Sequence, residues 1–159
     1  MEFRKMRRSA QQLSNEECIE ILKREPRGVL AVVGDEDYPY ALPLDFVYEE
    51  ENGKIYFHCA KVGYKLDALR NNNKVSFCVY DEGFRKEGDW ALNIKSIIIF
   101  GKIKFIEDQE ETIERVRKLA LKYYPTAEAV EEEIVKAGSR VQMLELTIEH
   151  MTGKLVNES

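Results

Sequence analysis

The sequence predicts an α+β fold in which six antiparallel strands form a small closed or partly closed β-barrel, with helices at both ends. Three observations support this class. Short segments rich in β-branched and aromatic residues follow one another, separated by clusters of turn residues. Strong helical periodicity is confined to a segment near the N-terminus and to the last third of the chain. Strands and helices do not alternate regularly, which excludes a doubly wound parallel sheet.

The N-terminal region contains a basic arm followed by the first helix. Residues 1–8 include four Lys or Arg side chains without helical spacing, so we expect an arm exposed to solvent. Ser14 and Glu17 have the spacing of a capping box, and the apolar residues that follow share one face of a helix. A helix is therefore predicted over residues 15–23.

Four strands are predicted in the first half of the chain, as apolar runs that end at turn sequences. Pro39 and Pro43 lie in the second run and require a strand edge or a bulge, because proline has no N–H to donate to a neighbouring strand. A short polar helix is predicted over residues 65–71. The four predicted strands span residues 28–33, 38–48, 54–59 and 74–80.

The second half of the chain predicts the longest strand, two helices and a last strand. The apolar run 90–106 contains Gly101, where we expect the strand to bend. Asp108 is placed to cap a helix that ends before Pro125. The remaining predicted elements are a helix over residues 126–137 and a strand over residues 141–148.

Length and composition restrict the class of protein further. The 159 residues fit one domain, over residues 1–159, that can bury a hydrophobic core. The 24 basic and 29 acidic side chains give a net charge of −5, which disfavours nucleic acid as the main partner. Cys18, Cys59 and Cys78 are an odd number without CxxC spacing, so we expect free thiols and a cytoplasmic protein. No apolar run approaches the ~20 residues of a membrane helix, and no membrane segment is expected.

The most informative segment is the turn between the third strand and the short helix. Gly63 permits close approach of the backbone, and the first N–H groups of the helix meet there. Lys61 and Lys65 add two positive charges on either side of the glycine. This arrangement suits a phosphate monoester. A solvated turn that contains two lysines is the alternative that the residues alone leave open.

Other catalytic and metal chemistry has little support. His58 and Cys59 are adjacent in a strand and point to opposite faces, so they do not form a nucleophile–base pair, and no residue is assigned a catalytic role. With His150 as the other histidine, the spacing predicts no metal site. The aromatic residues of the first three strands suit either the core or contact with a flat cofactor ring.

Several segments, in this order, give the sequence a resemblance to a known family. They are GVLAVV (28–33), YPYALPL (38–44), IYFHCAK (55–61) with Gly63 and KLD (65–67), KVSFC (74–78) and SIIIFGK (96–102). In this combination the chain resembles the pyridoxamine 5′-phosphate oxidase-like FMN-binding split-barrel family, and within it the nitroimidazole-resistance (Nim) related group. The resemblance spans about the whole chain. It implies a six-stranded antiparallel split β-barrel with flanking helices, and a homodimer that binds FMN in a groove between the subunits.

The resemblance also implies positions for the cofactor. Tyr64 departs from the group, whose members often have histidine there. The arginines with which enzymes that make pyridoxal phosphate hold their substrate are not evident near the C-terminus, which disfavours pyridoxamine phosphate oxidation. By position, Leu42, Pro43 and Leu44 would lie along the isoalloxazine ring, His58 and Cys59 beside it, Lys61, Gly63 and Lys65 around the phosphate, and Ser96 on the next ring-contacting strand, with Ala60 as a further cofactor-binding position.

The function that follows is that of an FMN-binding flavoprotein. The resemblance implies an oxidoreductase that passes electrons from a small-molecule donor to a small acceptor such as a nitroaromatic or a quinone, with the flavin carrying the redox chemistry. The alternative is a non-catalytic sensor or storage protein that holds flavin or haem on the same barrel, because fold does not determine function.

Overall fold

Seven antiparallel strands form one curled sheet in the computed structural model, which describes residues 2–158. The strands are β1 (Arg27–Val33), β2 (Pro39–Asp45), β3 (Val47–Glu49), β4 (Lys54–Ala60), β5 (Lys74–Tyr80), β6 (Leu92–Ile106) and β7 (Val141–Glu158). The α-helices are α1 (Asn15–Arg24), α2 (Tyr64–Asn71), α3 (Gln109–Tyr123) and α4 (Ala127–Ala137). Short 3₁₀ turns cover Ser9–Gln11, Asp35–Asp37 and Gly138–Arg140.

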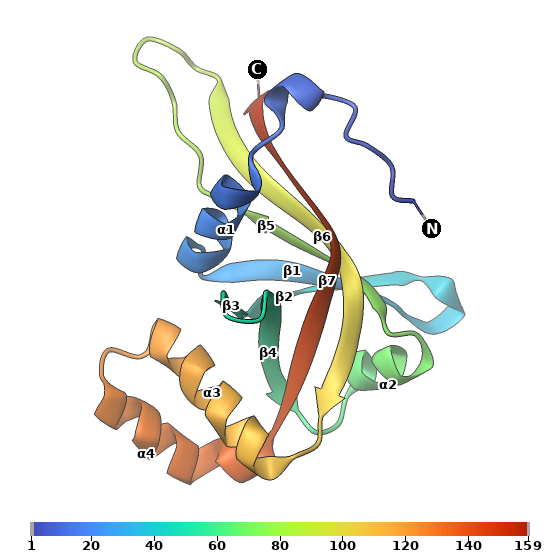
Figure 1. Cartoon of the computed structure of the whole chain (residues 1–159), viewed down its shortest axis with the longest axis vertical. Coiled ribbons are helices and arrows are strands. Elements are labelled where there is room, and N and C mark those ends of the chain that lie inside the picture. Colours follow the sequence, from blue (N-terminus) through green and yellow to red (C-terminus); the bar gives the residue numbers. More distant parts are fainter. Residues whose placement is uncertain (1, 159) are drawn as a thin grey trace.

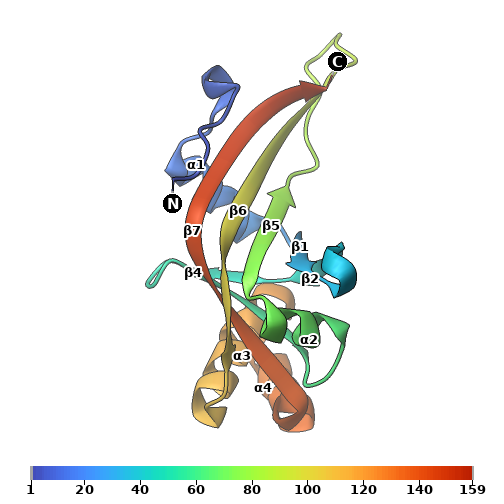
Figure 2. The same ribbon diagram turned by 90° about the vertical axis from the view of Figure 1, so that its right-hand side faces the viewer.

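The order of the strands makes the sheet a half-barrel. It is β2-β1-β5-β6-β7-β4-β3, so the two strands at the ends of the sheet follow one another in the sequence. Only Phe46 separates them, and the sheet therefore curls back on itself (Figures 1 and 2). Figure 1 shows the α3–α4 hairpin and α2 on opposite sides of the long β6–β7 pair. The predicted α+β barrel with flanking helices is confirmed.

The strand count differs from the prediction by one, because the predicted strand 38–48 breaks at Phe46. Side chains from α3 occupy both backbone polar groups of this residue. The Tyr123 hydroxyl accepts a hydrogen bond from the Phe46 N–H at 2.8 Å, and Lys122 Nζ donates to the Phe46 carbonyl at 3.0 Å. Burial lowers the pKa of Lys122 to about 8. With its backbone bound to a helix, Phe46 cannot continue a strand ladder, so β2 and β3 take different partners.

The core lies inside the half-barrel, and α1 contributes to it. Cys18, Ile21 and Leu22 of α1 are buried among the inward-facing side chains of the strands. The predicted capping box starts this helix, since the Ser14 hydroxyl accepts from the Glu17 N–H and the Glu17 carboxylate accepts from the Ser14 N–H, both at 3.2 Å. The prediction for the first helix is confirmed, with one further residue at its end.

The long strands β6 and β7 bend together at a bulge. The register shifts between Phe100 and Gly101, where the sequence predicts the bend. A Cβ atom on Gly101 would lie 2.2 Å from the backbone oxygen of Thr147, so the two strands approach too closely for any side chain. β7 continues ten residues beyond the predicted end at 148, because it stays paired with β6 as far as Leu92↔Glu158.

The N-terminal arm is not wholly exposed, which corrects the prediction for residues 1–8. Its first residue lies outside the described part of the chain. The ring of Phe3 stacks on the ring of His150, with 4.7 Å between centroids, and lies 5.8 Å from the ring of Phe100. Phe100 and His150 are cross-strand neighbours on β6 and β7, and they give the arm an aromatic surface to cover.

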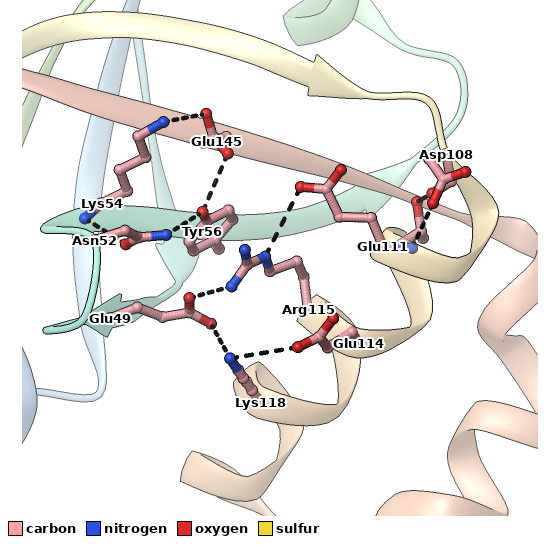
Figure 3. Close-up of polar contacts among 11 residues, drawn as sticks. Glu49, Asn52, Lys54, Tyr56, Asp108, Glu111, Glu114, Arg115, Lys118 and Glu145 are labelled. Carbon is pink, nitrogen blue, oxygen red and sulfur yellow. Dashed lines mark hydrogen bonds and ion pairs between the residues drawn. The ribbon is translucent and has the colours of Figure 1, made fainter.

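A buried polar network attaches α3 to the sheet (Figure 3). Arg115 of α3 pairs with Glu49 of β3, and its guanidinium lies over the ring of Tyr56, 4.6 Å from the centroid. The Tyr56 hydroxyl donates to Glu145 at 3.1 Å, and Lys54 pairs with the same carboxylate at 2.9 Å. Burial and the nearby Glu145 carboxylate raise the pKa of Tyr56 to about 12. The network holds the α3–α4 hairpin against the outer side of β4.

Candidate functional site

Two unpaired strand edges face each other where the barrel is open. Among the described residues, β2 pairs only with β1, and β3 covers β4 no further than Tyr56. Beyond that point β4 pairs only with β7 in this part of the chain, although β2 and β4 remain in contact. Continuing the β3–β4 register places Asp45 opposite His58. We call the gap between residues 42–45 and 57–60 the split.

The residues predicted to contact a flavin ring line the split mainly with backbone. Leu42 and Leu44 are half-buried, and their side chains pack against the barrel core. Pro43, between them, is exposed on the outer face. A flat ring along β2 would therefore meet Pro43 and the unpaired backbone groups of the strand edge. Such groups suit the carbonyl and N–H groups of a flavin.

The side chains of His58 and Cys59 point to opposite faces of β4, as their adjacency in the sequence predicts. Cys59 packs against the core, and its Sγ lies 3.6 Å from the backbone oxygen of Gln142. Burial raises the pKa of the Cys59 thiol, and the Lys65 charge offsets this in part. The thiol is protonated at neutral pH and is not a nucleophile. His58 and Ala60, which are two residues apart and share the other face of β4, are exposed.

The predicted phosphate turn lies directly at the end of the split. Lys61, Val62 and Gly63 connect β4 to α2, and all three are exposed. Gly63 has φ 150°, and nothing lies within 4 Å of the position of a Cβ atom. It is the N-cap residue of α2 and has no side chain that could accept a hydrogen bond from the first turn of the helix. The first N–H groups of α2 are therefore free of a side-chain cap, and in the sequence they fall between Lys61 and the half-buried Lys65.

Ser96 is not brought to this turn within one chain. It lies on β6 opposite Tyr80, the last residue of β5. α2 ends just before Lys74, the first residue of β5, and the six steps from Lys74 to Tyr80 span about 20 Å. Nine of the ten predicted residues therefore gather at the split and its turn, and Ser96 lies at the far end of β5.

An outer face of the sheet connects these two places, and sequence reasoning missed it. Two neighbouring cross-strand rows on this face contain no Lys, Arg, Asp or Glu, and Ile98 at their centre is 43% exposed. Pro43 of the split ends one row, and Ser96 lies two residues from Ile98 on the same face. The signal is in β6, where Ile97 to Phe100 is apolar on both faces. This apolar outer face comprises Val29, Pro43, Cys78, Ile98 and Thr152 in one row, and Ala31, Ala41, Ser76, Phe100 and His150 in the next.

His58 opens into a small cavity at the Phe46 end of the split. The cavity has a volume of about 150 Å³ and lies between β4 and the α3–α4 hairpin. Its polar lining consists of His58, Asp45, Tyr123 and two residues that sequence reasoning missed, Tyr124 and Glu133. They come from segments far apart in the chain, so no local pattern could have identified them. Val116, Leu119, Ala120 and Val141 supply much of its apolar lining.

The described part of the chain meets neither the requirements of a metal site nor those of a membrane-spanning helix. Residues 2–158 contain no group of three or more His, Cys, Asp or Glu side chains placed to hold a metal ion. No helix within these residues is long and apolar enough to cross a membrane.

The curled half-barrel sheet with its open split belongs to the class of split barrels, and the comparison with protein families gives the particular family. The model described as pyridoxamine 5′-phosphate oxidase matches residues 14–155. The chain belongs to this family, as its sequence resemblance predicts.

Solved structures share the fold at low sequence identity. A proposed 5-nitroimidazole antibiotic resistance protein of Bacteroides thetaiotaomicron is 21% identical over 92% of this chain and 87% of its own, with a TM-score of 0.75. A conserved hypothetical protein of Mycobacterium tuberculosis is 14% identical over 94% and 90%, with a TM-score of 0.79. The FAD and heme binding protein of Mycobacterium smegmatis is 21% identical over 94% and 74%, with a TM-score of 0.74. The comparison with curated proteins gives no significant match.

Proposed function

We propose that the protein binds FMN and passes electrons to small acceptors such as nitroaromatics or quinones. The observation that carries this proposal is the position of the basic turn, with Lys61 and Lys65 on either side of an uncapped helix start, directly at the end of the split. One ligand that joins a flat ring to a phosphate monoester matches both features. The flavin, when bound, supplies the redox chemistry.

The chain's own residues have distinct tasks in this proposal. Lys61, Lys65 and the first N–H groups of α2 bind the phosphate. The free edge of β2 and Pro43 orient the ring through backbone contacts. The cavity beside His58 receives the acceptor, since it adjoins the split and holds a single small ring. Related structures described as binding FAD, or FAD and heme, make a flavin site on this fold reasonable.

The absorbance spectrum of the purified protein tests the proposal first. Flavin bands with release of FMN on denaturation are expected, whereas a Soret band would favour the haem-binding alternative. Reduced protein is then mixed with a nitroaromatic or a quinone. Oxidation faster than that of free reduced FMN supports a reductase, and bound flavin that these acceptors do not reoxidise favours a sensor or a store.

A homodimer is part of the same proposal. Phe3 covers the apolar outer face at Phe100 and His150, but Ile98 in the neighbouring row stays exposed in a monomer. A second copy that covers this row could bring its own Ser96 toward Pro43 of the first. We expect a dimer in sedimentation experiments. Ile98→Lys should give a monomer with weakened FMN binding, whereas Val135→Lys, at an apolar site on α4 that is 88% exposed, should stay dimeric. A stable wild-type monomer at micromolar concentration that still holds FMN would contradict this arrangement.

His58 is expected to tune the reaction and not to act as an obligatory acid or base. It lines the cavity with Asp45 and Glu133, and no hydrogen bond within residues 2–158 orients its ring. His58→Asn should keep FMN and change acceptor reduction by roughly tenfold or less, because one modest hydrogen bond contributes about 0.5–1.5 kcal/mol. Stopped-flow oxidation of the reduced variant measures this. A collapse of thousands-fold with FMN still bound would identify His58 as a true catalytic acid.

A further inference from the structure

A tyrosine side chain joins the two sides of the split at the end near the basic turn. Tyr64, the first residue of α2, reaches the hairpin between β1 and β2, where its hydroxyl accepts a hydrogen bond from the Asp35 N–H at 2.7 Å. Its ring also packs on Tyr40 of β2, with 4.7 Å between centroids. Strand pairing does not join β2 to β4 in the described chain, so the Tyr64 side chain bridges the opening at this end.

The hairpin is shaped to receive the Tyr64 hydroxyl. A Cβ atom on Gly34 would lie 2.5 Å from that oxygen, so the contact requires glycine at this position. The hairpin is tightly folded, with positive φ at Glu36 and Asp37 and a hydrogen bond of 2.8 Å from the Gly34 N–H to the Tyr38 carbonyl. The fit therefore joins this tightly folded hairpin to the residue that follows Gly63.

We infer that Tyr64 is a positioning residue that holds the basic turn at a set distance from the edge strand β2. The turn follows β4 and contains Val62, which is 83% exposed and gives it no anchor in the core. On the helix side, Tyr64 is the side chain that ties the turn to the β1–β2 hairpin. A ligand that contacts the turn and β2 at once benefits from this constraint, and a ligand that contacts β2 alone does not.

The inference rests on the proposed function, and a pair of flavins tests it. FMN spans the turn and the strand, whereas riboflavin lacks the phosphate. Tyr64→Phe should weaken FMN about 3- to 10-fold in titrations of the flavin-free protein and leave riboflavin within about twofold, because one hydrogen bond is lost. The matched control is Tyr38→Phe on the same hairpin, where the side chain is 73% exposed and its hydroxyl makes no hydrogen bond within residues 2–158. Equal weakening of both flavins, or no change in their ratio, would overturn the inference.

A second measurement tests the contact without flavin. Gly34→Ala should lower the unfolding midpoint of the flavin-free protein, and it should do so much less when Tyr64 is already replaced by alanine, because the main clash is then gone. Additive effects would show that the hairpin does not depend on Tyr64. If the two substitutions are coupled but the wild-type protein does not prefer FMN to riboflavin, the phosphate assignment is wrong. The proposed role of Tyr64 in positioning the turn for a cofactor is then wrong as well.

Discussion

Gly101→Ala is expected to lower the free energy of unfolding by about 3 kcal/mol, the largest effect of any single methyl group we consider. The added Cβ would meet the backbone oxygen of Thr147 at 2.2 Å and a methyl group of Leu146 at 2.8 Å. A backbone oxygen in the paired strand β7 cannot withdraw without breaking the ladder with β6. Urea unfolding followed by circular dichroism measures the loss.

The control for this variant is Gly88→Ala. Gly88 has φ 79° but nothing within 4 Å of the added Cβ, so its cost is that of the backbone conformation, about 1 kcal/mol. If both variants lose the same stability, the close approach of β6 and β7 is not the reason for glycine at the bulge.

Removing both lysines of the basic turn is expected to weaken FMN binding about 100-fold. A charge-assisted contact to phosphate is worth roughly 1.5–3 kcal/mol, so Lys65→Ala alone should cost about tenfold or more, and Lys61→Ala adds a comparable factor. Riboflavin, which has no phosphate, should bind the double variant as it binds the wild type. Titration of the flavin-free proteins measures both affinities.

Lys74→Ala is the matched control, because Lys74 is an exposed lysine just beyond the C-terminal end of α2. It should leave FMN affinity unchanged. Normal FMN binding by the double variant, or equal affinity of the wild type for riboflavin and FMN, would rule out the phosphate assignment.

The elements of the fold could be predicted where their causes are local. The capping box at Ser14 and the bend at Gly101 depend on a few neighbouring residues, and both are confirmed. The break at Phe46 could not be predicted, because the side chains that occupy its backbone come from α3, more than seventy residues later. The prediction of a fully exposed N-terminal arm is wrong for the same reason, since Phe3 packs on residues of β6 and β7.

The candidate site likewise has features that could be predicted from local sequence and features that could not. The basic turn is contiguous in the sequence, so its charges and its glycine are visible without a structure. The cavity beside His58 and the contact between Tyr64 and Asp35 depend on tertiary packing, and neither leaves a local pattern. Leu42 and Leu44 can lie beside a ring only through the backbone of β2, because their side chains point toward the core.

The two prolines of β2 have a consequence for how this protein behaves at high concentration. An edge strand with unpaired N–H and C=O groups is a template on which another chain can add a strand and start aggregation. Proline is accommodated in an edge strand with its nitrogen on the unpaired side, so Pro39 and Pro43 remove two donors that an incoming strand would need. The edge that lines the split can thus remain open to a small molecule while it resists pairing with a polypeptide.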